Sequence, residues 1–172
     1  MAEERERGAY VTLAEAGVAP GEIAVSKWAS GTIATLVTQT LACLLLGFAP
    51  ARLAALLALS AVGVQPLLLM GLAAGLSARE QMASSLLAVP LTVVALTPVL
   101  SFVSDTVRAI MWFCPLGPVA EVVRAACGVG TAAPAPVLVG LAIAWTAAAA
   151  ALAARECRQF ARELASERDR LA

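Results

Sequence analysis

Three long runs without a charged residue constrain this chain more than any other feature of its sequence. They cover residues 28–48, 53–76 and 82–104, and a helix needs roughly 20 apolar residues to cross the hydrocarbon core of a bilayer. A fourth uncharged run, residues 137–154, lies at the lower limit of that length and follows two prolines that favour a helix start. The charged residues lie between the runs and at the two ends. This pattern predicts an all-α, polytopic membrane helix bundle with about four transmembrane helices.

Composition supports a membrane location and narrows the possible functions. Apolar residues make up 60% of the chain and charged residues 14%, whereas a soluble domain is about half apolar and about a quarter charged. The chain has no histidine, the commonest general base and metal ligand, and its four cysteines form no C-x-x-C pair. No basic cluster with interleaved aromatic residues is present, which argues against nucleic acid as a partner. We therefore expect no catalytic residue, metal ligand or cofactor in this chain.

The stretch between the third and fourth runs has a different character. Residues 109–120 are apolar but too short to span a bilayer, and they contain two prolines and a glycine. Backbone at membrane depth must be hydrogen-bonded or buried in protein. We expect residues 105–130 to form one re-entrant hairpin of two short helices that is broken at residues 114–118.

The distribution of Lys and Arg predicts the orientation, because these residues favour the cytoplasmic side. With the N-terminus inside, four crossings place residues 1–27, 77–81 and 155–172 in the cytoplasm. These segments hold nine of the 12 basic residues. We expect a multi-pass protein of the cell membrane with both termini cytoplasmic and the 105–130 hairpin on the outer face. Residues 155–172 lack a helix breaker and should extend the last helix as a solvated cytoplasmic tail.

Four ionisable residues lie nearest to membrane depth, each at the edge of a span or in the predicted hairpin: Glu80, Asp105, Glu121 and Arg124. Asp105 and Arg108 are three positions apart, as are Glu121 and Arg124, and this spacing favours ion pairs within one helix. Because ionisable side chains in a membrane are often functional, a substrate gate is the alternative.

Polar residues inside the spans indicate helix faces that meet another helix and not lipid. On the first run they form a stripe, which comprises Thr32, Thr35, Thr38 and Gln39. The stripe predicts helix packing, with solute binding as the alternative. In the second run, Gln65 precedes Pro66, so this point is either a kink that lines a pathway or a hydrogen bond to another helix.

The segment before the first span has its own organisation. Within residues 3–27, a charged run and a glycine precede a short amphipathic helix that we expect at residues 10–16, with Gly17 as its C-cap. A Pro-Gly turn follows, Glu22 suits the positive end of the next helix, and Lys27 marks the membrane boundary. Because a helix of seven residues is unstable by itself, we expect a partner surface to hold it.

The order of residues in this segment resembles the cytoplasmic coupling segment of the type-2 family of ATP-binding-cassette (ABC) permeases, in its branch of sodium and drug efflux permeases. The matching residues are Glu4, Glu6, Arg7, Gly8, Ala9, Leu13, Pro20, Glu22, Ile23 and Lys27. The family usually has threonine where this chain has Ala9, and its proline usually lies slightly earlier than Pro20.

Two later stretches are also similar to this family. One is the small polar link at residues 77–83, and the other is Pro115-Leu116-Gly117-Pro118-Val119 in the expected outer hairpin. The resemblance covers about residues 3–155. Permeases of the family have six spans, two of them before the coupling segment, so this chain looks like the C-terminal two-thirds of such a permease.

The resemblance implies a permease subunit of an ABC exporter, which moves a solute with ATP that a separate ATPase subunit hydrolyses. The chain itself has no phosphate-binding G-x-x-x-x-G-K-[ST] loop, so we expect it not to be an enzyme. The resemblance assigns contacts with the ATPase to Glu6, Arg7, Gly8, Leu13, Pro20, Glu22 and Lys27. The alternative function is a non-transporting membrane scaffold or accessory protein.

The number of spans bears on the partners that we expect. Four helices with polar stripes favour a homodimer, or pairing with a chain that supplies two further spans. A secondary carrier would need a mid-membrane acid or base and an internal repeat, and we find neither in the sequence. Cys114 and Cys127 would both lie outside, where a disulfide is chemically permitted, but the sequence does not fix their distance.

Overall fold

The described part of the chain consists of helices and the turns that connect them, without a strand. The computed structural model describes residues 9–78, 81–126, 128 and 130–171, and these confirm the all-α prediction. The helices are α2 (Ala9–Glu15), α3 (Pro20–Leu45), α4 (Pro50–Gly63), α5 (Gln65–Ser77), α6 (Gln81–Leu100), α7 (Asp105–Met111), α8 (Gly117–Ala126) and α9 (Ala135–Leu171).

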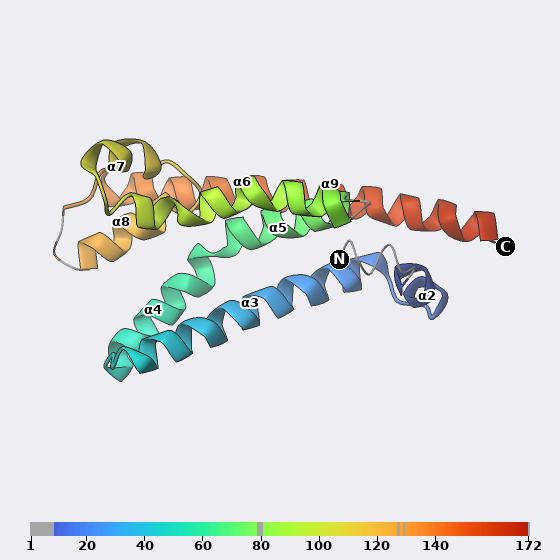
Figure 1. The fold of residues 1–172 in the computed structure, drawn as a ribbon, viewed down its shortest axis with the longest axis horizontal. Helices are drawn as coiled ribbons and strands as arrows, with labels where there is room; N and C mark the ends of the chain where they lie inside the picture. Colours follow the sequence, from blue (N-terminus) through green and yellow to red (C-terminus); the bar gives the residue numbers. More distant parts are fainter. Residues whose placement is uncertain (1–8, 79–80, 127, 129, 172) are drawn as a thin grey trace.

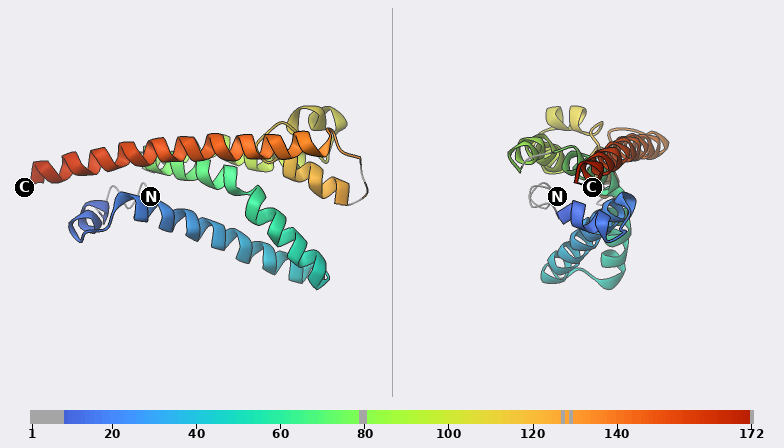
Figure 2. Two further views of the ribbon diagram at one scale, coloured as in Figure 1. Left: turned by 180° about the vertical axis from the view of Figure 1, so that it is seen from behind. Right: turned by 90° about the vertical axis from the view of Figure 1, so that its right-hand side faces the viewer.

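The helices run back and forth along one long axis. Figure 1 shows that α3 leads away from the end occupied by α2, α4 and α5 lead back, α6 leads away again and α9 returns. Helix α9 packs along α5 more extensively than any other two helices pack together, and α6 packs on α5 as well. Helices α3 and α4 form an arm that diverges from this layer toward the turn between them, as the two views in Figure 2 also show.

The connection between α2 and α3 follows the local sequence closely. Gly17 has a φ of 87°, and the Val18 N–H donates to the Leu13 carbonyl at 3.0 Å, which confirms Gly17 as the C-cap. Helix α2 covers Ala9–Glu15, which overlaps the expected helix at residues 10–16. Pro20 then occupies the first turn of α3, where its missing N–H is not needed.

Two predicted spans have different boundaries from those expected. Helix α3 begins at Pro20, so the first apolar run is the later part of a longer helix. The second run is not continuous, because α4 and α5 are separate helices that meet at an angle of 41°. The cause is Pro66, which lacks the N–H of a helix interior and whose ring crowds the carbonyl four residues earlier.

The length of the helices supports fewer spans than the four expected. Among the described residues, α3 and the Ala135–Ser166 part of α9 are long and apolar enough to cross a membrane alone, and the bent α4–α5 pair makes a third candidate if it counts as one span. The described apolar part of α6, Ser85–Leu100, is shorter. The third apolar run does not continue as helix to residue 104, because α6 ends at Leu100 and a turn follows.

The last helix joins the two ends of the molecule. Helix α9 continues from its apolar part into the charged tail without a break, which confirms the helical tail as far as Leu171. The end of α9 and α2 lie at one end of the molecule, whereas α7 and α8 lie at the other (Figure 1). The predicted hairpin is therefore present as two short helices.

A small hydrophobic core, with two aromatic rings in it, fixes the end that contains α2. Its buried residues come from α2, α3, α5 and α9, and they are Tyr10, Ile23, Ala24, Leu76, Phe160 and Leu164. The rings of Tyr10 and Phe160 meet edge to face, with centroids 5.4 Å apart. Helix α2 is therefore held by the chain's own tail, which corrects the expectation that only a partner surface could hold so short a helix.

We expect Phe160→Ala to release α2 from the tail. Removing a fully buried phenylalanine costs about 3–5 kcal/mol of unfolding free energy, so the thermal unfolding of the purified protein in detergent should shift to lower temperature and protease should cleave near α2 sooner. Phe48→Ala, which removes a partly exposed ring between α3 and α4, is the matched control. Equal shifts for the two variants would contradict the role of the Tyr10–Phe160 contact.

Candidate functional site

A buried carboxylate lies at the centre of the α7–α8 end. Only 1% of the Glu121 side chain is exposed. Arg108 donates from Nε to Glu121 Oε1 at 2.9 Å and from a terminal nitrogen to Oε2 at 2.7 Å, a bidentate pairing. The backbone N–H of Ala132 donates to Oε2 at 2.7 Å, and Arg124 Nε lies 3.6 Å from Oε1. Glu121 therefore connects α7, α8 and the segment before α9.

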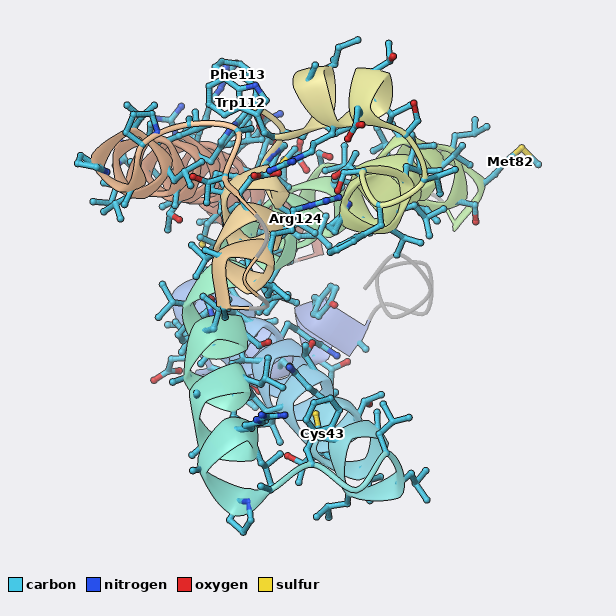
Figure 3. All side chains as sticks on the ribbon, turned by 90° about the vertical axis from the view of Figure 1, so that its left-hand side faces the viewer. Cys43, Met82, Trp112, Phe113 and Arg124 are labelled. Atoms are coloured by element: carbon cyan, nitrogen blue, oxygen red, sulfur yellow. The ribbon has the colours of Figure 1, made fainter. Side chains whose placement is uncertain are left out.

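Arg124 extends this network to the end of α6. Its guanidinium donates to the carbonyl oxygen of Ser101 and lies 3.2 Å from the Ser101 hydroxyl oxygen. It also lies over the ring of Phe102, 3.9 Å from the centroid. Figure 3 shows Arg124 reaching from α8 toward α6, far from Cys43 in the α3–α4 arm. Together with Arg108, which also donates to the Gly130 carbonyl, Arg124 ties four segments around one carboxylate.

The network tests the two ion pairs expected from sequence. Glu121 and Arg124 are within ion-pair distance, as their spacing predicts. The pairing of Asp105 with Arg108 is wrong for the described residues, because Arg108 turns toward Glu121 and Asp105 stays exposed. A buried carboxylate on the facing helix offers Arg108 two charge-assisted hydrogen bonds, which outweigh one solvated pair within a short helix.

The surroundings keep Glu121 ionised. The hydrogen bonds from Arg108 lower the pKa of the Glu121 carboxyl below its usual value, burial opposes this shift, and the Ala132 N–H and the charge of Arg124 add to it. A buried anion that is held by two guanidinium groups stabilises one arrangement of the hairpin, because separating the partners would leave charges without compensation.

The prolines of the hairpin are buried on the other side of this network. Pro115 lies between α7 and α8, Pro118 lies in the first turn of α8, and both line a cavity beneath that helix. The connection after α7 is also held by α9, because Trp145 Nε1 donates to the Phe113 carbonyl at 2.8 Å. The aromatic residues Trp112 and Phe113 lie beside α9 in Figure 3.

The polar residues within the spans are engaged in helix contacts. Gln65 accepts a hydrogen bond from Trp28 Nε1 at 2.8 Å and donates to the Ala61 carbonyl, so the α4–α5 break also carries a hydrogen bond to α3. Gln39 donates across to the Leu56 carbonyl at 3.5 Å, whereas Thr35 bonds to its own helix. These contacts favour helix packing for Gln39 and Gln65.

The residues that the family resemblance assigns to ATPase contact lie at the opposite end. Leu13 is 40% exposed on α2, and Glu22 accepts a hydrogen bond from the Ala19 N–H at 2.9 Å, which caps α3. Pro20 and Lys27 lie in the first part of α3. Outside the described residues lie Glu6, Arg7, Gly8, Glu80 and Cys127, while Cys114 is a free thiol.

The sequence did not predict four residues that contact the hairpin network or the polar residues of the spans. Arg124 donates to Ser101 and lies over the ring of Phe102. Trp28 donates to Gln65, and Trp145 donates to the Phe113 carbonyl. The tryptophans carried a usable signal, because an indole N–H inside an apolar run needs an acceptor. Ser101 and Phe102 carried none, since their role depends on a residue more than twenty positions away.

Comparison with known proteins did not place the chain in a family. No protein-family model matches it, and neither the curated proteins nor the solved structures gave a match.

We expect Glu121→Gln to loosen the hairpin. The amide leaves the buried guanidinium of Arg124 without its carboxylate and removes one acceptor from Arg108, which should lower the unfolding free energy by about 1–3 kcal/mol. Asp105→Asn removes an exposed carboxylate from the same hairpin and should change the unfolding temperature little. A larger decrease in unfolding temperature for Asp105→Asn than for Glu121→Gln would contradict the assignment of the stabilising charge to Glu121.

The network should also make stability depend on pH on the acid side. Because the pKa of Glu121 is lower in the folded protein, its contribution is fully present above the unfolded pKa, about 4.3. The contribution is lost as the pH falls through the folded pKa. Unfolding temperatures measured from pH 7 downward should therefore decrease below about pH 4.3. Glu121→Gln should show a smaller decrease, and an unchanged slope in this variant would contradict the assignment.

Proposed function

We propose that this chain is the permease subunit of an ABC exporter, which moves a solute across the cell membrane with ATP that a separate subunit hydrolyses. The observation that carries the proposal is α2, a seven-residue helix that turns sharply into the first long apolar helix and presents Leu13 at its surface. A short helix at the end of a membrane bundle is suited to enter a cleft on a partner, and this one already has a fixed position.

The attachment of α2 supports a role in coupling. Tyr10 joins α2 to Phe160 of α9, and Ile23 of α3 and Leu76 of α5 belong to the same buried cluster. A force on α2 therefore acts on α3, α5 and α9 together. At the other end, Trp145 and the Glu121 network attach α9 and its preceding loop to the hairpin. Partner movement at α2 would reach the outer hairpin through α9.

The direction of the helices supports the proposed topology. Helix α2 and the tail of α9 lie at one end, and the α7–α8 hairpin lies at the other (Figure 1). If α3, the α4–α5 pair, α6 and α9 each cross the bilayer, both termini lie on one side, and the excess of Lys and Arg assigns that side to the cytoplasm. The hairpin would then be a re-entrant element of the outer face, with Glu121 and its partners holding its backbone together.

Assembly completes the proposal. The arm formed by α3 and α4 carries many exposed apolar side chains, including Ile33, Leu41 and Leu45, which suit lipid or another subunit. We propose a homodimer, or pairing with a chain that supplies two further spans, and alternating access or extrusion at that interface. A membrane scaffold or accessory protein is the competing function. It would use the same helices but would not bind an ATPase through α2.

Leu13→Asp tests the coupling role of α2. If Leu13 enters a cleft on the ATPase, burial contributes about 1.5–3 kcal/mol, so the substitution should weaken ATPase binding roughly ten- to hundredfold in a pull-down. Transport should be lost while membrane insertion is retained, because α2 lies outside the proposed spans. Ala16→Asp, which adds the same charge next to α2 at an exposed position, should retain binding.

Two results would count against the exporter. If no ATPase with a P-loop co-purifies with the wild-type protein, the scaffold or accessory function becomes the better explanation. If an ATPase does co-purify and Leu13→Asp binds it with unchanged affinity, α2 is not the coupling helix.

A further inference from the structure

A cavity lies beneath α8, on the side opposite the Glu121 network. It has a volume of about 510 Å³ and is bounded by α4, the start of α5, α8 and α9. Its wall includes Leu59 and Pro66 from the first two helices, Val119 from α8, and Leu138 and Ala142 from α9. Pockets that hold drug-sized ligands have volumes of roughly 300–1,000 Å³, so the cavity is large enough for a small molecule.

The break between α4 and α5 shapes this cavity. Gly63, the last residue of α4, lies so close to α8 that a Cβ atom there would be 2.5 Å from Cγ2 of Val119. The absence of a side chain lets α8 close against the bend, and Pro66 turns α5 away immediately afterwards. The cavity therefore results from a specific contact between α4 and α8.

The lining carries no charged residue among those described, and it has one hydroxyl. That hydroxyl, on Thr146, donates to the Ala142 carbonyl at 2.8 Å. The guanidinium groups of Arg108 and Arg124 are absent from the lining and are engaged with Glu121, in the network on the other face of α8. A phosphate, sulfonate or carboxylate placed in the cavity would lose its hydration without gaining a cation, which is strongly unfavourable. Charge complementarity therefore selects an uncharged occupant.

The rim of the cavity indicates how such an occupant arrives. Val139 and Ile143 of α9 and Val62 of α4 line the cavity and are also largely exposed. The cavity thus opens sideways between apolar side chains, on a surface that α9 would present to the bilayer. An uncharged hydrophobic molecule concentrates in a bilayer and would reach the cavity from there.

We propose that the cavity between α4, α8 and α9 is a binding site for a small, uncharged hydrophobic molecule. Helix α8 supplies its outer wall, and the Glu121 network on the opposite face of α8 positions that wall. Binding itself does not depend on an ATPase partner. Only the identification of the bound molecule with the exported solute rests on the proposed function.

Fluorescent dyes test the site in the full-length protein held in lipid nanodiscs. An uncharged anilinonaphthalene dye should give a saturable signal above that of empty nanodiscs, whereas its sulfonated derivative should not. Ala142→Trp and Ala150→Trp place an indole at two lining positions and should abolish the saturable signal. Ala144→Trp introduces the same ring on α9 outside the lining and should retain it. Unfolding temperatures identify any variant that fails to fold.

Several results would overturn the proposal. These are the absence of saturable binding in the wild-type protein, equal binding of the sulfonated dye, or retention of the signal in both lining variants that fold. Saturable binding in detergent micelles that is lost in lipid nanodiscs would assign the cavity to a lipid acyl chain. A change of oligomeric mass in Ala142→Trp but not in Ala144→Trp would assign it to a subunit interface. Because no ATPase is present, the outcome is independent of the test of coupling.

Discussion

The contact of α9 with α5 is the interaction on which the other parts of this structure depend. Small residues make it close, since Ala73 on α5 and Ala149 and Ala153 on α9 are buried. Small side chains let helix backbones approach, which matters where lipid competes equally for apolar surfaces. Helix α9 then extends beyond α5 in both directions, and its two ends receive α2 and α8.

The two ends of α9 are held by different physics. At the tail, aromatic and aliphatic side chains from α2, α3 and α5 surround Phe160. This apolar contact holds α2 in place without requiring hydrogen bonds of one particular direction. At the other end, hydrogen bonds to one buried carboxylate fix the hairpin in a specific geometry. Helix α9 thus joins a non-directional apolar contact to a directional polar one, and the proposed coupling uses it as the link between the two ends.

Much of the secondary structure was predictable because its causes are local. Gly17 ends α2 through its positive φ, and the charged tail continues α9 because nothing in it breaks a helix. The sequence indicated a kink at Pro66, but it did not indicate that α8 would pack against the bend. Two helices meeting at 41° leave room for α8 only because Gly63 lies at the bend opposite Val119. The spacing of residues along the chain carries no information about the contact between Gly63 and Val119.

The sequence by itself determined that this chain forms long apolar helices, since uncharged runs of that length leave a helix as the way to satisfy the backbone. It also determined where several helices begin and end. Only the tertiary structure decided that Arg108 pairs with Glu121 and not with Asp105, that Gln65 meets Trp28, and that α8 covers an apolar cavity. These contacts join residues that are distant in the chain, so their geometry exists only after the helices have packed.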